Sequence, residues 1–286
     1  MSSRTASELA EKMRAMVRRE CAAILRALAS LHRVHLSIHR ARKSIRHLRA
    51  LLSLVDYGLA EAAAIDRVLE RLGDSLSTLR DAHVIIATAE TLAASDTSKQ
   101  WQPAIDRLVQ RRDALVQRSL ARDIDFHRRR AAVERAARQL DDMAWARVKP
   151  KDIQQRLAHS SRRVAKAETR AKADPTTQNL HRWRRRVRKL RMQIEALSEI
   201  APEIVQNAVK ESASKKLKEL HRLSDQLGAL RDEQMLRNVL RRMSDLPHYG
   251  EIALQLREQL ALRESKLVKR AVVTLDRRPR GNLNCA

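Results

Sequence analysis

Two stretches of the sequence combine histidine, arginine and leucine at matching positions. They are HRARKSIRHLR, residues 39–49, and HRWRRRVRKLR, residues 181–191. The first contains five Lys or Arg residues and the second contains seven, and neither contains an acidic residue. Lysine and arginine donate charge-assisted hydrogen bonds to phosphate oxygens, and the forked guanidinium suits phosphate geometry. The chemistry that these residue types predict is the recognition of a polyanion.

On a helix, each stretch places its charges beside an apolar stripe. The apolar stripes contain Ile38, Ala41, Ile45, Leu48, Leu52 and Val55 in the first copy, and Leu180, Trp183, Val187, Leu190, Ile194 and Leu197 in the second. The basic stripes contain His39, Arg42, Arg46 and Arg49, and His181, Arg184, Arg188 and Arg191. Four more cations, Arg40, Lys43, Arg182 and Arg186, are predicted to point further round the helix, toward solvent.

Like charges one helical turn apart repel each other, so such a stripe costs stability unless an anion lies against it. A solvated face that serves solubility, with arginine stems lying over apolar surface, is the alternative. Two copies with the same angular placement favour a binding surface. The candidate contacts from these two helices also include His35, Lys43, Arg185 and Lys189.

Further candidate contacts lie outside the two stretches. Lys216 falls on the apolar side of its predicted helix, so it must pair, line a polar cavity or extend its ammonium to solvent. Lys215, Lys218 and Arg222 continue the positive field around it. Arg80 and Arg231 are candidates because each follows a leucine and precedes an aspartate at matching positions. Those aspartates, Asp81 and Asp232, are predicted to be structural, either holding arginines or capping a helix.

The composition predicts an all-α fold. Apolar residues make up 43% of the chain but aromatic residues only 2%, and there are only five glycines and six prolines. Few helix breakers together with abundant Ala, Leu, Arg and Glu are typical of a helical protein. The net charge of +25 predicts an anionic partner, for which nucleic acid, an anionic membrane surface and inorganic polyphosphate are the candidates.

The sequence favours a soluble, cytoplasmic protein. Its two cysteines, Cys21 and Cys285, have neither disulfide-framework nor metal-binding spacing, which indicates a reducing compartment. No window approaches the about 20 consecutive apolar residues of a membrane span. The N-terminal segment also lacks the apolar run of a signal peptide. We therefore expect no membrane association.

The apolar rhythm predicts ten helices, over residues 7–31, 35–56, 59–76, 79–92, 104–140, 152–173, 177–200, 203–227, 230–243 and 251–275. Residues 93–103 are predicted to form a loop that Pro103 closes. The pattern lapses before Pro150, which indicates a domain junction. Residues 276–286 are predicted to form a basic disordered tail.

A second pair of matching segments indicates an internal duplication. LGDSLSTLRD, residues 72–81, matches LSDQLGALRD, residues 223–232, at an offset of 151 residues, whereas the His/Arg stretches match at an offset of 142. Two matches in the same order predict a duplicated helical bundle. The predicted domains are residues 1–145 and 146–275, followed by the tail.

These features resemble the CHAD family, the conserved histidine α-helical domain. The resemblance lies in VHLSIHRARKSIRHLRALL and LHRWRRRVRKLRMQIEAL, in which each His is followed by basic residues three, seven and ten positions on, and in the two Leu-x-x-Leu-Arg-Asp endings. It implies two four-helix bundles related by pseudo-twofold symmetry, with a basic groove or channel between them. It also implies binding of inorganic polyphosphate and association with polyphosphate granules, with the two basic stripes as contacts.

Non-enzymatic polyphosphate binding is therefore the leading hypothesis, and nucleic-acid binding through the same basic surface is the alternative. Scarce aromatic residues favour polyphosphate, because single-stranded nucleic acid is bound with aromatic stacking platforms. The sequence has neither a phosphate-binding glycine loop nor a nucleophile with a base at a recognisable spacing, so no enzyme and no cofactor are predicted. His35 and His39 have metal-ligand spacing, but the neighbouring arginines would repel a cation, so no metal is predicted. The oligomeric state is left open.

Overall fold

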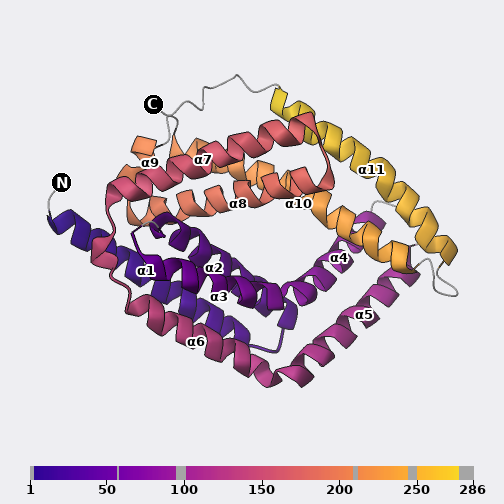
Figure 1. Ribbon diagram of the computed structural model, residues 1–286. Coiled ribbons are helices and arrows are strands. Elements are labelled where there is room, and N and C mark those ends of the chain that lie inside the picture. Colours follow the sequence, from indigo (N-terminus) through magenta and orange to yellow (C-terminus); the bar gives the residue numbers. More distant parts are fainter. Residues whose placement is uncertain (1–2, 57, 95–100, 209–211, 244–249, 277–286) are drawn as a thin grey trace. The chain divides into compact units, whose positions relative to one another are not determined.

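The computed structural model of the 286-residue chain describes residues 3–56, 58–94, 101–208, 212–243 and 250–276. These residues form α-helices and short 3₁₀ turns, and no strand occurs among them, which confirms the predicted all-α fold (Figure 1). The helices are α1 Ser3–Ala29, α2 Val34–Val55, α3 Ala60–Ser75, α4 Ser77–Ala93, α5 Trp101–Arg122, α6 His127–Asp141, α7 Pro150–Ala173, α8 Thr177–Ile200, α9 Pro202–Ala208, α10 Ala213–Met243 and α11 Gly250–Asp276. The 3₁₀ turns are η1 Ile124–Phe126 and η2 Trp145–Arg147.

The described residues group into two compact units. The first contains the chain up to Leu76 and Asp123–Arg222, and the second contains Ser77–Arg122 and the described chain from Leu223 onward. Each unit thus takes residues from both predicted halves, 1–145 and 146–275. The duplication itself stays a prediction. The predicted tail lies outside the described residues except for Asp276, which ends α11.

In the first unit α2 packs against α1, α3, α7 and α8, and α7 lies beside α8 (Figure 1). Both predicted apolar stripes are buried, so their prediction is confirmed, and Ile38 and Trp183 have no exposed surface. The starts of α7 and α8 follow from local chemistry. Pro150 occupies the first turn of α7, where its missing N–H costs nothing, and the Thr176 hydroxyl accepts a hydrogen bond from the Asn179 amide at the start of α8.

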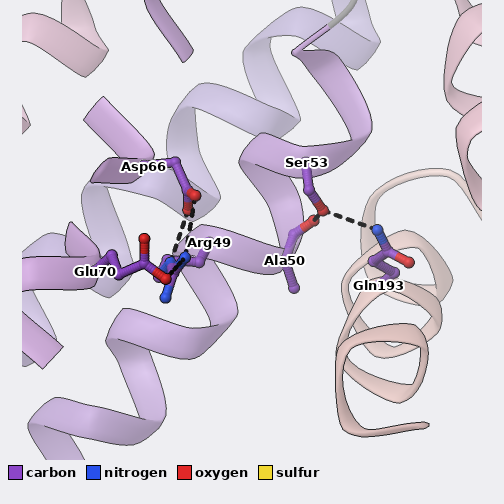
Figure 2. Close-up of polar contacts among 6 residues, drawn as sticks. All are labelled: Arg49, Ala50, Ser53, Asp66, Glu70 and Gln193. Atoms are coloured by element: carbon purple, nitrogen blue, oxygen red, sulfur yellow. Dashed lines mark hydrogen bonds and ion pairs between the residues drawn. The ribbon is translucent and has the colours of Figure 1, made fainter. Parts of the chain in front are cut away.

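A buried polar contact joins the two helices that carry the His/Arg stretches. Gln193 of α8 has no exposed surface, and its Nε2 donates to Ser53 Oγ of α2 over 2.9 Å. The Ser53 hydroxyl in turn donates to the Ala50 carbonyl over 2.6 Å (Figure 2). Because a buried amide is costly when it lacks partners, this contact favours one relative placement of α2 and α8.

The second unit has its own apolar core, formed by α4, α5, α10 and α11. Trp101 is buried in that core, at the first residue of α5. The predicted loop over residues 93–103 was therefore wrong at both ends, since α4 reaches Ala93 and α5 already includes Pro103. Proline is tolerated there because the first helical turn needs no N–H donor.

The prediction of one continuous helix over residues 104–140 was also wrong, because the helix is interrupted between α5 and α6. Asp125 and Phe126 adopt left-handed backbone conformations, with φ of 50° and 52°. Buried Asp123 stabilises this break by accepting hydrogen bonds from the Arg128 amide over 2.7 Å and the Arg129 guanidinium over 2.8 Å. The Phe126 ring is fully buried under the Arg129 guanidinium, 5.2 Å from its centroid.

The predicted helices over residues 203–227 and 230–243 were divided at the wrong place. The structure has the short α9 and then α10, which continues through Gly228 to Met243. Leu227 and Leu230, on either side of this glycine, are both buried. Their packing outweighs the cost of about 1 kcal/mol that glycine imposes inside a helix.

We predict that Asp123→Ala destabilises the protein by about 2 kcal/mol, because it removes a helix cap and leaves Arg129 without its carboxylate partner. Chemical denaturation followed by circular dichroism measures the loss. Asp123→Asn, which keeps an acceptor oxygen for the Arg128 amide, should lose about half as much. Equal stability of the wild type and Asp123→Ala would show that the cap does not hold the break.

Candidate polyanion-binding site

An open cavity of about 390 Å³ lies among α2, α3, α7 and α8 in the first unit. Its lining residues are Arg46, Arg49, Ala50, Asp66, Glu70, Arg163, Arg182, Arg185, Arg186, Arg188, Lys189 and Met192. Eight of them are cationic and two are anionic, so the cavity has a formal excess of six positive charges. Such a field attracts anions and concentrates them near the surface.

A second cavity of about 530 Å³ is lined by residues of α7 and α8. Its lining residues are His159, Arg162, Arg163, Lys166, Ala167, Arg170, Arg182 and Arg186, and no carboxylate is among them. Arg163, Arg182 and Arg186 line both cavities. The two cavities therefore adjoin, and we refer to their combined lining as the basic track.

The basic track follows from how α7 and α8 pack. On α8, Trp183, Val187 and Leu190 face the core, so the cations next to them in sequence flank the buried stripe. On α7, Val164 and Ala167 are buried, so Arg163 and Lys166, which precede them in the sequence, likewise flank a buried stripe. Two helices that pack side by side through their apolar faces thus bring their basic flanks together.

Burial and mutual repulsion both lower pKa values in the track. Burial lowers the pKa of Arg186, and the positive charges of Arg163, Arg182 and Arg185 lower it further. Burial also lowers the pKa of His159, and nearby arginines, first Arg163, act in the same direction. A bound anion would relieve this repulsion, because it favours the charged form of each group.

Two carboxylates of α3 fix one arginine of the first cavity. Arg49 donates to Asp66 over 2.8 and 3.1 Å and to Glu70 over 2.8 Å (Figure 2). Although burial opposes the charged form, these hydrogen bonds raise the pKa of Arg49. The guanidinium is thus held in place and its charge is partly compensated, so Arg49 adds less to the field than its neighbours do.

Several predicted contacts meet in the first cavity. Arg46 and Arg49 come from the first His/Arg stretch, and Arg185, Arg188 and Lys189 come from the second. Arg182 and Arg186, which were predicted to point toward solvent, are half-buried and line both open cavities. The neighbouring α7 covers a face that an isolated helix would leave to water.

Other predicted contacts lie outside the lining of the two cavities. They are His35, His39, Arg42, Lys43, His181, Arg184 and Arg191. Arg42 donates to the Gly73 carbonyl, and Arg191 lies 3.7 Å from Glu195, which also contacts His47 and His221. Their contact with a ligand stays a prediction.

Two of the predicted ligand contacts on α10 and α4, Lys216 and Arg80, form ion pairs with carboxylates of the chain. Lys216 pairs with Glu219 over 3.6 Å, one of its three predicted alternatives, while Lys215, Lys218 and Arg222 are exposed. In the second unit, Arg80 pairs with Asp81 over 3.0 Å and with Asp232 over 3.6 Å. Arg231 is half-buried beside Asp232 in the sequence. The two repeated aspartates thus share one arginine.

Sequence reasoning missed the residues that α7 contributes to the track: His159, Arg162, Arg163, Lys166 and Arg170. Their signal was a cationic row with helical spacing at positions 159, 163, 166 and 170. Glu168 lies in the same segment, which therefore lacks the absence of acidic residues that marks the two His/Arg stretches.

The described residues lack the features of two other classes of site. No cluster of three or more His, Cys, Asp or Glu side chains has an arrangement that could hold a metal ion within the described ranges. Likewise, no helix in the described part of the chain combines the length and the apolarity needed to cross a membrane.

Comparisons with known proteins identify the family from the sequence and show a similar fold in solved structures. The sequence matches the CHAD domain over residues 9–217. The fold is similar to the crystal structure of the CHAD domain from the plant Ricinus communis, with a TM-score of 0.68 and 19% identity over 95% of this chain and 92% of that one. It is also similar to PptA from Streptomyces chartreusis, with a TM-score of 0.64 and 14% identity over 94% of this chain and 99% of that one. No curated protein sequence matches significantly. The helical fold and the two His/Arg stretches agree with this match, which covers most of the chain. The chain therefore belongs to the CHAD domain family.

Proposed function

We propose that the chain binds inorganic polyphosphate through the basic track and catalyses no reaction on it. The observation that carries the proposal is that Arg163, Arg182 and Arg186 line both cavities, which makes the cationic surface continuous. Polyphosphate is a flexible string of charged units, so it can follow such a surface. Each guanidinium offers several donors to phosphate oxygens, and released counterions favour binding.

The lining of the track favours polyphosphate over nucleic acid. Its side chains are those of Arg, Lys, His, Ala and Met with two carboxylates, and neither Phe, Tyr nor Trp is among them. Trp183, next to Arg182 on α8, is fully buried. Single-stranded nucleic acid gains much of its affinity from aromatic stacking, which this lining does not offer.

Membership of the CHAD family supports the same proposal, because the resemblance implies polyphosphate binding and association with polyphosphate granules. In this proposal the protein acts in the cytoplasm as a binding module that attaches to such granules. The basic stripes on α2 and α8 then extend the contacts beyond the track.

Replacing Arg163, Arg182, Arg185 and Arg186 together by Gln should weaken polyphosphate binding by about 100-fold or more, because four phosphate contacts and their counterion release are lost. Fluorescence anisotropy of labelled long-chain polyphosphate measures the affinity, and circular dichroism checks that helicity persists. The matched control replaces exposed Arg128, Arg135, Arg138 and Arg147 by Gln, which removes the same charge elsewhere in the first unit. Equal losses from the two variants would show attraction by diffuse charge rather than by a built site.

Proton uptake by His159 should accompany binding. Burial and the nearby arginines lower the pKa of His159 in the free protein, and a bound polyanion raises it by offsetting those charges. Affinity should therefore increase as the pH falls through the higher pKa of the bound state, and level off below the lower pKa of the free state. Calorimetry in two buffers of different ionisation enthalpy measures the protons taken up. His159→Gln should abolish the proton uptake that His159 contributes. Unchanged proton uptake in this variant would show that His159 is not part of the binding site.

Competition separates polyphosphate from nucleic acid. At equal phosphate concentration, single-stranded DNA should not displace labelled polyphosphate, because the track provides charge without stacking platforms. Duplex DNA should not displace it either, because a stiff duplex cannot follow the track as a flexible chain can. Displacement by either DNA at equal concentration would favour the nucleic-acid alternative. Release of orthophosphate from the polymer in the same samples would contradict the non-enzymatic part of the proposal.

A further inference from the structure

The first cavity contains a nucleophile among its phosphate-binding groups. Lys189 alone among the side chains that line this cavity carries a primary amine. It lies on α8 with arginines of α2, α7 and α8 around it, and it is exposed enough for a small reagent to reach it. Guanidinium groups stay protonated and do not attack electrophiles, so they bind a phosphate group while the lysine remains able to react.

In the free protein, the surroundings of Lys189 lower its pKa. Burial lowers the pKa of Lys189, and the positive charges of Arg163 and Arg49 act in the same direction, while Asp66 and Asp56 oppose them. An amine with a lowered pKa is unprotonated more often near neutral pH, and only the unprotonated amine is a nucleophile.

We propose that Lys189 is a site of N-acylation by acyl phosphates, which the arginines of the first cavity hold by their phosphate group. The neutral amine attacks the acyl carbon, an N–C bond forms, and the bond from that carbon to the bridging oxygen breaks. The electron pair leaves with the phosphate, which takes up the proton that the amine loses. The products are an amide on Lys189 and hydrogen phosphate, so atoms and charge balance without any further reactant.

The cavity provides two effects that accelerate such an acyl transfer, namely proximity of the reactants and stabilisation of the leaving phosphate. Holding the phosphate beside the amine makes the reaction effectively unimolecular. Negative charge grows on the leaving phosphate as the bond breaks, and the guanidiniums of Arg163, Arg185 and their neighbours stabilise it. Lys215 and Lys218 on α10 are exposed and outside the cavity lining, so they provide matched reference lysines on the same chain.

Acylation would alter the site itself, an inference that rests on the proposed function. The amide carries no charge, so the formal excess of the cavity falls by one positive charge. Bound polyphosphate would in turn shield Lys189 from acyl phosphates. The modification and the polymer would therefore compete for one cavity.

The test treats the full chain with acetyl phosphate and follows acetylation of each lysine by quantitative peptide mass spectrometry. Lys189 should react about tenfold faster than Lys215 and Lys218, because the reagent is concentrated and oriented beside it. The preference should become much smaller with N-acetylimidazole, an acetyl donor without phosphate, because only the lowered pKa of Lys189 then favours it over the reference lysines. Excess pyrophosphate should reduce the preference for acetyl phosphate in the same way. A Lys189 rate equal to the reference lysines, or the same preference with both donors, would overturn the inference.

Three variants separate this inference from the proposed function. Arg163→Gln with Arg185→Gln should remove the preference for Lys189, whereas Arg128→Gln with Arg135→Gln should leave it intact. Lys189→Gln, which mimics the acylated state, should weaken polyphosphate binding by about fivefold, as loss of one partly exposed contact implies. If polyphosphate binds the track but acetyl phosphate shows no preference, only the inference fails. If the arginine variants change neither property, both fail.

Discussion

The packing of α7 against α8 is the constraint from which the candidate site follows. Both helices bury an apolar stripe, and the cations that flank those stripes are consequently held near each other whatever their mutual repulsion. Hydrophobic burial is the larger and less directional contribution, so it can hold like charges together at a cost of a few kcal/mol. Burial is the largest cause of the lowered pKa values of Arg186 and Lys189, and repulsion by neighbouring arginines adds to both shifts.

The sequence was informative wherever a single helix decides the outcome. The buried stripe of α8, from Leu180 to Leu197, follows from spacing alone, because apolar residues recur every three to four positions. The cations beside it could therefore be placed on the right helix. Whether Arg182 faces open solvent or lines a cavity depends on the position of α7, which the sequence of α8 does not contain.

The misplaced boundaries have the same origin. The break at Asp123 depends on a buried carboxylate that caps α6 and on a Phe126 ring that needs a core to enter. The continuity of α10 through Gly228 depends on leucines that pack on either side of it. Local propensity is a weak guide in both cases, since tertiary packing decides between a helix that ends and one that continues.

The hydrogen bond between Gln193 and Ser53 favours one register of α8 against α2, and this register positions the residues of the site. Apolar ridges alone would tolerate a slip of one helix along another, and a slip of one turn displaces every side chain by about 5.4 Å. In such a shifted register the arginines of α8 would no longer stand opposite Arg46 and Arg49 of α2. A single buried amide on α8, next in sequence to the cavity residue Met192, thereby helps to fix the spacing of those arginines.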